Sequence, residues 1–480
     1  LLRCILFLLP SFVTSRIISS SVQHERSQGR LGPTSYLDGM RGLAALFVFF
    51  CHYSYSAFAI ADGYGSNNEN RYLLKLPIFR LLYAGPPMVA IFFIVSGYAL
   101  SLKPLKLARS QRWGELSTTM SSFIFRRAFR LFLPTFISTF MVVVLLRLGA
   151  YEWNREWSLD RTWHWNVQET APQRLNTTAL QLDDWGRNMF DFVHVWGWEK
   201  YGGSTWYDVH LWTIPIEFRA SMMLFLTLLG TARLRTGLRL GFLALLIAFS
   251  YYSDRWEMVL FLVGMGYAEL DLIRGAHSDP STTAVATAPP AAATAAAGEG
   301  SEQQQQQQQQ QREQQKRHRA CALLSRLYWA SLALGSLYLL SQPDVNSENT
   351  PGWIYLSSLI PDWISDKYRY WQCNGAILFV FCTARVPRMQ RVFNSPPVQY
   401  LGKISYAVYL MHGPVMHTVG YSIQRWAWEV SGVDGRAQYK RGFVLGAVFA
   451  VPVVVWAADV FWRAVDAPVV RFAKWLEGRC

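Results

Sequence analysis

An arginine and a histidine bracket one apolar stretch near the start of the chain. Arg41 stands at its polar edge, and His52 follows eleven residues later among apolar neighbours. At a helical rise of about 1.5 Å per residue, the histidine lies roughly 16 Å beyond the arginine. Residues 42–61 can cross a bilayer as one helix, which puts His52 near mid-membrane. An ionisable group at that depth favours a functional site, although a hydrogen bond to a neighbouring helix explains it equally well.

A second histidine shares a helical face with a glutamate. His210 and Glu217 are seven residues apart, which corresponds to two turns, and Pro215 lies between them. A carboxylate in lipid needs a histidine, an arginine or water as its partner. Glu217 could orient or charge-balance a catalytic histidine, as carboxylates do in catalytic triads, or it could make a structural hydrogen bond at a proline kink. We favour the functional interpretation.

A third histidine, His412, ends the stretch 404–412. If its helix rises from the cytosol near Leu401, His412 reaches nearly the depth of His52. Two histidines at one depth could line one cavity, or they could hold neighbouring helices together. The sequence contains no Gly-x-Ser-x-Gly elbow, no Walker loop and no metal-binding histidine spacing, so we expect no metal.

A basic cluster, Arg126, Arg127 and Arg130, precedes another apolar block. Orientation of the chain by positive charge explains such a cluster. Arg127 and Arg130, however, are three residues apart on a helix, so both guanidinium groups can face one anion. That arrangement suits a phosphate-bearing cosubstrate arriving from the cytosol. By contrast, the small pair Ser96 and Gly97 is more typical of close helix packing than of a nucleophile.

The composition indicates the class of fold that must position these residues. The chain has 480 residues, of which 51% are hydrophobic and 16% charged, and its apolar residues form blocks too long for a soluble core. The net charge of +14 could suggest nucleic acid, but the basic residues lie in short loops between the blocks. Membrane orientation is the better explanation, and we expect no nucleic-acid partner. The six cysteines are scattered, with no metal spacing and no evident disulfide framework.

We therefore predict an all-α, polytopic membrane protein of about ten transmembrane helices with both ends in the cytosol. The two short blocks, 241–252 and 256–272, could instead be re-entrant. The loop 150–205 is predicted to face the lumen and contains the glycosylation sequon at Asn176. The apolar blocks are residues 42–61, 83–102, 131–149, 206–230, 241–252, 256–272, 321–340, 371–384, 400–421 and 443–462.

The predicted domain organisation has one interruption. Residues 1–35 form a cytosolic segment; residues 4–13 resemble a signal-peptide core broken by Pro10, and the absence of an initial methionine means that the true N-terminus could be missing. Residues 273–320, rich in alanine and then glutamine, are predicted to be a disordered cytosolic linker. This linker separates the two parts of the membrane domain, which are followed by a short cytosolic tail. Those three regions are residues 36–272, 321–465 and 466–480.

Five motifs, in this order, resemble the acyltransferase 3 family of integral-membrane O-acyltransferases, in its fungal form. Each motif is weak alone, but together they extend across most of the chain, to about Trp462. They are residues 36–45 with His52, 92–98, 126–134, 211–219 and 401–412.

The resemblance implies transfer of an acyl group, often acetyl, from acyl-CoA to a hydroxyl of a carbohydrate, lipid or secondary metabolite. The family's Arg-x10-His pattern corresponds to Arg41 and His52, and its Arg-x-x-Arg pattern to Arg127 and Arg130. The implied partners are the bilayer, acyl-CoA as a cosubstrate with no tightly bound cofactor, and a hydroxyl-bearing acceptor. An endomembrane (ER or Golgi) or plasma-membrane location is expected.

The mechanism expected from these residues places the CoA phosphates on Arg126, Arg127 and Arg130, with Arg41 helping. His52 acts as general base on the acceptor hydroxyl, Glu217 orients or balances a histidine, and His210 and His412 are further catalytic candidates. An acyl-histidine relay is an alternative route. The rival class is a proton-coupled transporter, since membrane histidines and carboxylates also build proton relays. A receptor-like or scaffold protein, for which His52 would be dispensable, is the third possibility.

Overall fold

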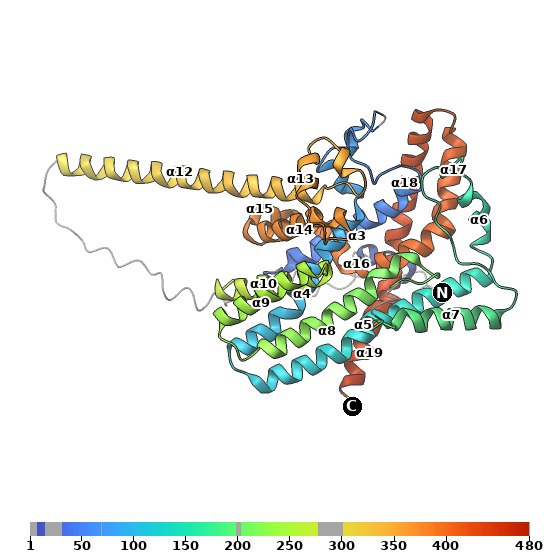
Figure 1. The fold of residues 1–480 in the computed structure, drawn as a ribbon, viewed down its shortest axis with the longest axis horizontal. Coiled ribbons are helices and arrows are strands. Elements are labelled where there is room, and N and C mark those ends of the chain that lie inside the picture. Colours follow the sequence, from blue (N-terminus) through green and yellow to red (C-terminus); the bar gives the residue numbers. More distant parts are fainter. Residues whose placement is uncertain (1–6, 15–30, 69, 198–202, 277–300, 480) are drawn as a thin grey trace.

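The computed structural model describes residues 7–14, 31–68, 70–197, 203–276 and 301–479, and within these ranges every regular element is helical. Most of the helices pack side by side in one bundle, from which α12 projects (Figure 1). The predicted all-α architecture is confirmed. The long helices are α3 (Ser35–Tyr55), α4 (Gly85–Arg109), α5 (Trp113–Arg147), α8 (Thr213–Thr231), α9 (Thr236–Tyr252), α10 (Trp256–Ile273), α12 (Ser301–Leu340), α14 (Lys367–Arg385), α16 (Pro396–Val415) and α18 (Arg436–Phe461).

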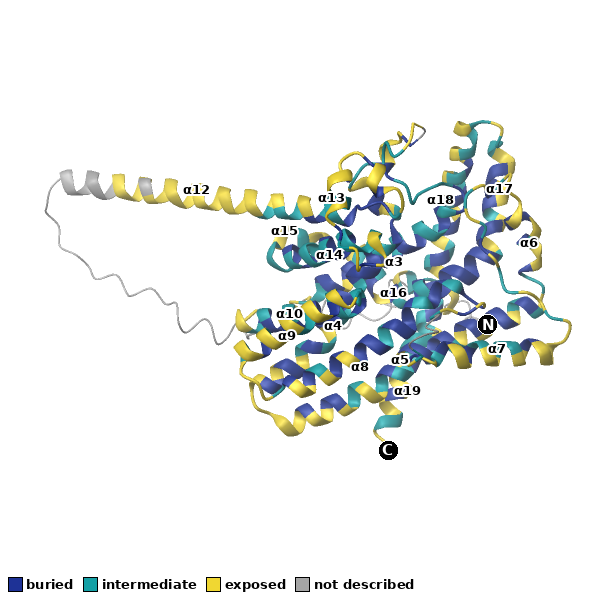
Figure 2. Ribbon diagram, in the orientation of Figure 1, coloured by how far each residue is buried: buried dark blue, intermediate teal, exposed yellow. Residues whose placement is uncertain are grey.

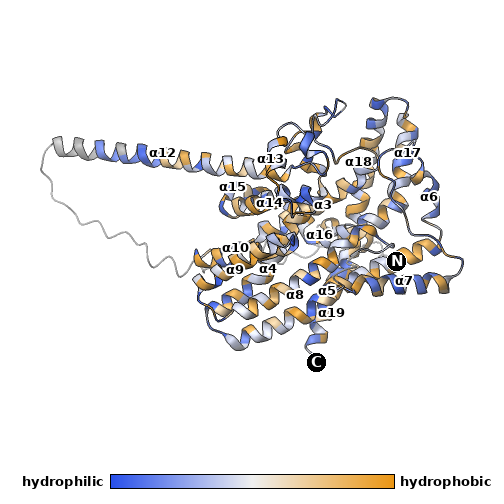
Figure 3. Cartoon of the chain, viewed as in Figure 1, coloured by the Kyte–Doolittle hydropathy of each residue, from blue (hydrophilic) through white to orange (hydrophobic). Residues whose placement is uncertain are grey.

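Each of the ten predicted apolar blocks overlaps one of these helices, but the bounds differ: α3 ends at Tyr55, so residues 56–61 of the first predicted block lie outside it. By length and composition, five described helices or helix runs are suited to cross a membrane, which supports a polytopic membrane protein; the number ten remains a prediction. The helices of the bundle consist largely of apolar residues, whereas the part of α12 that projects from the bundle is largely polar (Figure 3). The five are Gly85–Arg109, Trp113–Arg147, Val209–Thr231, Gln309–Leu340 and Arg436–Glu477.

Shorter helices connect and cover the bundle. Two 3-10 turns, Leu73–Lys75 and Phe79–Tyr83, precede α4, and two π turns extend α16 and α18. Bulges of this kind insert a residue into a helix and re-aim the side chains beyond it. The short elements are α6 (Glu152–Leu159), α7 (Thr178–Val193), the 3-10 turns Val209–Trp212 and Ser347–Asn349, α13 (Ile354–Ser358), α15 (Pro387–Phe393), the π turns Met416–Gly420 and Trp462–Asp466, α17 (Tyr421–Ser431) and α19 (Ala467–Glu477).

Helices α3 and α16 form the centre of the arrangement, and they approach each other at glycines. A Cβ on Gly42 would overlap the backbone of Gly402, and a Cβ on Gly402 would overlap the backbone of Asp38. Glycine permits this contact because it has no side chain, as in other close helix pairs within membranes. Both helices start at the same end of the bundle, where the Gln399 amide donates to the carbonyl of Ser35 (2.7 Å). They therefore run in parallel.

The predicted linker differs in part from the observed structure. Residues 301–320, which were expected to be disordered, belong to α12, a single helix that continues to Leu340. Glutamine is a good helix former, and the run of glutamines extends an apolar helix that is already nucleated. The described side chains of residues 309–327 are exposed, so this part of α12 buries almost nothing (Figure 2). Residues 277–300 lie outside the described ranges, and the cytosolic position of the linker stays a prediction.

The segment 150–205, here called the outer segment, contains α6 and α7 and packs against one end of the bundle. The Asn154 amide donates to the carbonyl of Thr418 (2.6 Å), and the Asn166 amide donates to the carbonyl of Tyr55 (2.6 Å). The exposed sequon precedes α7, whose first turn is capped by Thr177. These bonds hold the outer segment against the far end of α3. Its residues 198–202, like residues 4–6 of the predicted signal-like stretch, lie outside the described ranges.

Candidate active site

The three histidines singled out from the sequence meet at one place in the bundle. His52 lies ten residues beyond Gly42 on α3, and His412 lies ten residues beyond Gly402 on α16. Since the two helices run in parallel from that glycine contact, both histidines reach the same height, about 15 Å further along. Their rings stack with centroids 5.3 Å apart.

His210 joins them from the turn that precedes α8. Its ring centroid lies 4.1 Å from that of His52 and 4.6 Å from that of His412. Two contacts fix the turn: the Tyr409 hydroxyl donates to the carbonyl of His210, and the Asp208 carboxylate accepts from the backbone N–H of His210 (3.0 Å). We call His52, His210 and His412 the histidine cluster.

Two carboxylates flank the ring of His210. Asp208 Oδ1 lies 2.8 Å from Nδ1, and Glu169 Oε1 lies 2.6 Å from Nε2. The first contact has hydrogen-bond geometry. The second does not, because the Glu169 oxygen is off the N–H axis, and it is a close ion pair instead. Both carboxylates are almost completely buried, with side chains 3% exposed.

Glu169 has further partners around the cluster. Its Oε2 lies 3.5 Å from His417 Nε2 and accepts from the Tyr421 hydroxyl at 3.5 Å. Burial by itself would raise the pKa of Glu169, but the charges of His210 and His417 outweigh that effect and hold the pKa well below its usual range. Glu169 is therefore a buried carboxylate ion in the outer segment.

Sequence reasoning missed both carboxylates. Asp208 is only two residues before His210, and that spacing could have suggested a local pair. Glu169 is separated from the three histidines by 41 residues or more and belongs to no motif, so no signal in the single sequence pointed to it. Only the packing of the outer segment onto the bundle brings it to the cluster.

The ring nitrogens of the histidine cluster differ in their hydrogen-bond and ion-pair partners. His412 Nδ1 lies 3.2 Å from the carbonyl of Val408, and its Nε2 is buried with no hydrogen-bond partner among the described residues. His52 is partly exposed, whereas His210 and His412 are buried. His210 has a carboxylate at each nitrogen. His52 and His412 are thus better placed than His210 to exchange a proton.

The cluster also has the residue types of a metal site. One nitrogen from each histidine lies within 4.8 Å of the others, close enough to approach a single ion. Asp208 and Glu169 lie at the two nitrogens of His210, and these contacts account for the position of its ring without a metal. The expectation from the sequence that the protein holds no metal stays a prediction.

Glu217 contacts an arginine rather than a histidine. Its Oε1 accepts from Arg127 Nη2 (2.7 Å) and from the Ser96 hydroxyl (3.0 Å), and Arg127 also donates to Ser221 (2.9 Å). Ser96 therefore takes part in this pair, and its neighbour Gly97 packs against the backbone of Phe261, as expected for close helix contact. We name these contacts the Arg127–Glu217 pair.

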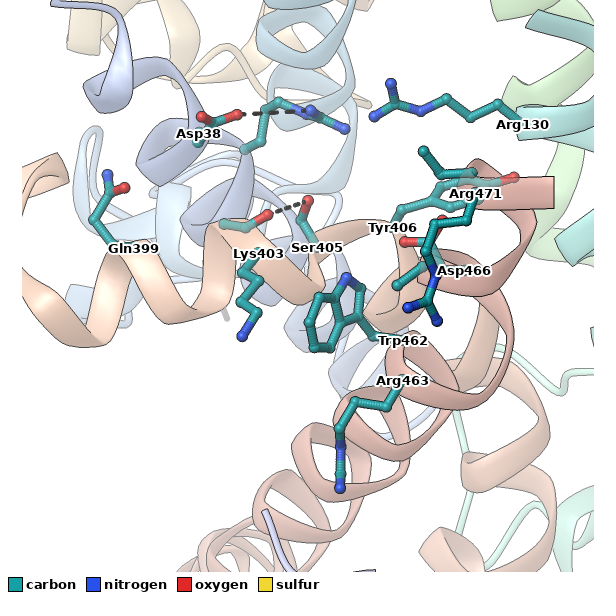
Figure 4. A pocket seen from close by; sticks show the side chains of 14 residues that line it. Asp38, Arg130, Gln399, Lys403, Ser405, Tyr406, Trp462, Arg463, Asp466 and Arg471 are labelled. Atoms are coloured by element: carbon teal, nitrogen blue, oxygen red, sulfur yellow. Dashed lines mark hydrogen bonds and ion pairs between the residues drawn. The ribbon is translucent and has the colours of Figure 1, made fainter. Parts of the chain in front are cut away.

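A basic cavity of about 740 Å³ opens at the end of the bundle where α3 and α16 begin (Figure 4). Arg41 and Arg130, both singled out from the sequence, line this cavity, whereas Arg127 does not and Arg126 pairs with Glu477 (3.1 Å) outside it. The ammonium group of Lys403 lies 4.1 Å from the ring centroid of Trp462. The charged lining residues are Arg41, Arg130, Lys403, Arg463 and Arg471, with Asp38 and Asp466.

The cavity and the histidine cluster are connected by the same two helices. Arg41 in the cavity precedes His52 by eleven residues on α3, and Ser405 in the cavity precedes His412 by seven residues on α16. These separations correspond to roughly 16 Å and 10 Å along the helix axes. A ligand with a charged head in the cavity and an extended arm could therefore bring its far end to the histidines.

Comparison with known proteins defines the class. The model of the acyltransferase 3 family, described as an acyltransferase domain, matches residues 34–463, so the chain belongs to this family. The chain is therefore an acyltransferase, and its apolar helices support a place in the membrane. No solved structure matches it.

Fungal enzymes are among its relatives. The chain is 30% identical to the O-acetyltransferase PaAT-1 of Phomopsis amygdali, over 94% of this chain and 86% of that protein. It is 27% identical to acyltransferase R4 of a Phoma species and 26% identical to acyltransferase clz18 of Cochliobolus lunatus. Each of these two alignments covers 91% of this chain and 94% of the relative.

Proposed function

We propose that this acyltransferase moves an acyl group from acyl-CoA, bound in the basic cavity, to a hydroxyl group that reacts beside His52. The observation that carries the proposal is the placement of a basic cavity and a histidine cluster on the same pair of parallel helices. An acyl-CoA has the matching form, with phosphates at one end and a thioester at the end of a long arm.

The charge and size of the cavity support a phosphorylated donor. Five basic and two acidic side chains line it, which leaves an excess of positive charge. Its volume of about 740 Å³ lies within the range of small-molecule and cofactor sites. Arginine suits phosphate because its planar guanidinium group can donate two parallel hydrogen bonds.

The proposed reaction needs one base, which takes a proton from the acceptor and later gives it to the leaving thiolate. A ring nitrogen of His52 takes the proton of the acceptor hydroxyl as the oxygen attacks the thioester carbonyl. The new C–O bond forms, the C–S bond breaks, and the thiolate of CoA takes the proton back from His52. His52 is suited to this role because it is the partly exposed member of the cluster.

The acyl group and the acceptor are proposed from the relatives. One relative carries the name O-acetyltransferase, which supports acetyl as the acyl group and oxygen as the acceptor atom. A hydroxyl of a carbohydrate, lipid or secondary metabolite is the class of acceptor that we propose. An endomembrane or plasma-membrane location fits the apolar helices equally well.

The test is thiol release from acetyl-CoA by the purified protein in detergent, with glucose, glycerol and dodecanol as model acceptors. We expect release that depends on protein and increases with an acceptor. A transporter would release no thiol, and that result would overturn the proposal.

Variants of the cavity separate donor binding from chemistry. Arg130→Ala and Lys403→Ala should raise KM for acetyl-CoA about tenfold or more and change kcat less, because phosphate is bound equally in ground and transition states. Arg388→Ala is the matched control, since Arg388 is exposed and does not line the cavity. An unchanged KM in both cavity variants would refute this donor site.

A further inference from the structure

We propose that Glu169, in the outer segment, is a positioning residue for acyl transfer: with Asp208 it fixes His210 as an ion pair against His52. This inference rests on the proposed function and extends it to a residue outside every family motif found in the sequence. It also assigns His210 a different role from the one first considered, because a histidine held in this way is not the base.

The first step concerns the surroundings of Glu169. Three other parts of the chain converge on its carboxylate: His210 comes from the turn before α8, His417 from the π turn after α16, and Tyr421 from α17. Its side chain is 3% exposed. A carboxylate buried so completely is stable only when it is paired, so these contacts determine where the outer segment lies.

The second step concerns the ring of His210. Asp208 lies at Nδ1 and Glu169 lies at Nε2. A neutral imidazole would carry a lone pair on the nitrogen beside one of these carboxylates, whereas the protonated ring has no lone pair at either nitrogen and places a positive charge between the two carboxylates. Two carboxylates therefore favour the cation, which has no free lone pair with which to accept a proton from substrate. His52 and His412 remain as the groups that can do so.

The third step concerns the charge next to His52. The two carboxylates Glu169 and Asp208 hold the ring of His210, which packs against His52. When His52 takes the acceptor proton it becomes positive, and the carboxylates that hold His210 stabilise this charge. The effect is large because the site is buried, where charges interact more strongly than in water.

The fourth step concerns access of water. The space between the outer segment and His210 is a cavity of about 10 Å³, lined by Glu169, Asp208, His210 and His417 among others. A cavity of that size has room for about one water molecule. The contacts of Glu169 thus close the outer end of the cluster and limit screening of the charges by solvent.

The decisive variant is Glu169→Gln, which keeps the size of the side chain and removes its charge. We expect kcat for thiol release from saturating acetyl-CoA to fall about 10–100-fold, because the ion pair that holds His210 against His52 is lost. KM for acetyl-CoA should stay within about twofold, because Arg41 in the donor cavity lies roughly 16 Å from His52 along α3. The matched control is Glu156→Gln, an exposed carboxylate on α6 of the same segment, which should leave both constants unchanged.

A double variant separates positioning from a merely structural role. If Glu169 acts through His210, then Glu169→Gln combined with His210→Gln should be no slower than His210→Gln alone, within about twofold. Independent roles would multiply the two losses. Multiplied losses, or wild-type kcat in Glu169→Gln at normal protein abundance, would overturn the proposal.

Two further outcomes have separate meanings. If the wild-type protein releases no thiol from acetyl-CoA, the proposed function fails, and with it the catalytic part of this inference. If EDTA abolishes thiol release by the wild-type protein and zinc restores it, the cluster is a metal site and the ion-pair assignment of His210 is wrong. With transfer intact and insensitive to EDTA, the Glu169 variants alone decide the inference.

Discussion

His52 and His412 lie side by side because each follows, by ten residues, the glycine at which its helix contacts the other. Gly42 and Gly402 touch through their backbones, and the helices that carry them run in parallel. Equal spacing from one contact point places the two rings at equal height, with centroids 5.3 Å apart. The distance between the histidines is therefore set far from them, at the end of the bundle that also holds the basic cavity.

The first prediction concerns His52. Loss of a positioned general base lowers a reaction rate by about 10²–10⁴-fold. His52→Ala and His52→Gln should therefore both lower the rate of acyl transfer by a factor in this range. Glutamine can hydrogen-bond a neighbouring helix but cannot take the proton. Thiol release from acetyl-CoA and protein abundance in membranes are measured together. If His52→Gln keeps near-parental activity, His52 is structural and His412 becomes the candidate base.

The second prediction concerns Gly413, which follows His412. A Cβ at this position would lie 2.8 Å from Asp208 Oδ2 and 2.9 Å from His210 Nδ1, closer than real contacts allow. Gly413→Ala should therefore displace the Asp208–His210 pair and lower kcat by at least about tenfold. Gly230→Ala on α8 is the control, since a Cβ there meets nothing within 4 Å. Equal activity of the two variants would show that the cluster tolerates a shift of Asp208.

The third prediction concerns the Arg127–Glu217 pair. Both side chains are largely buried, so removing one partner leaves the charge of the other uncompensated. For a buried pair this lowers the free energy of unfolding by about 3–5 kcal/mol. Arg127→Ala should lower the thermal midpoint and the abundance of the protein rather than raise KM for acetyl-CoA. The double variant Arg127→Met with Glu217→Gln should recover much of that loss. If Arg127→Ala is as stable as the parent and raises KM, this arginine binds the donor instead.

The sequence predicted much of the fold because membrane helices are encoded locally, in the length of apolar blocks. All ten blocks overlap helices, and the depth argument for His52 and His412 correctly suggested that they could meet. Two expectations differed for physical reasons. Residues 301–320 extend a helix that was already formed. Glu217 pairs with an arginine on α5 instead of with His210, which lies in the 3-10 turn before α8 rather than on the same helix. Glu169 could not be predicted, since its position depends on how a long loop packs onto the bundle.

The last prediction concerns pH and His164, a buried histidine of the outer segment. Its ring lies against Trp157 (centroids 4.5 Å apart), Tyr421 (5.3 Å) and Trp428 (5.7 Å), and neither ring nitrogen has a hydrogen-bond partner among the described residues. Burial lowers the pKa of His164 from 6.5 to about 4. Between these two values the unfolded chain binds a proton at this position and the folded chain does not.

Stability should consequently fall as the pH falls through this window. From pH 7 to pH 5 the loss from His164 alone is about 2 kcal/mol, and stopping at pH 5 avoids the range in which unfolded carboxylates take up protons. Thermal unfolding followed by tryptophan fluorescence should show a lower midpoint at pH 5 than at pH 7. His164→Phe should reduce that difference, because phenylalanine fits an aromatic cluster and does not titrate, whereas replacing the exposed His194 with glutamine should leave it unchanged. If His164→Phe retains the full difference between the two pH values, another group is responsible for the acid sensitivity of the outer segment.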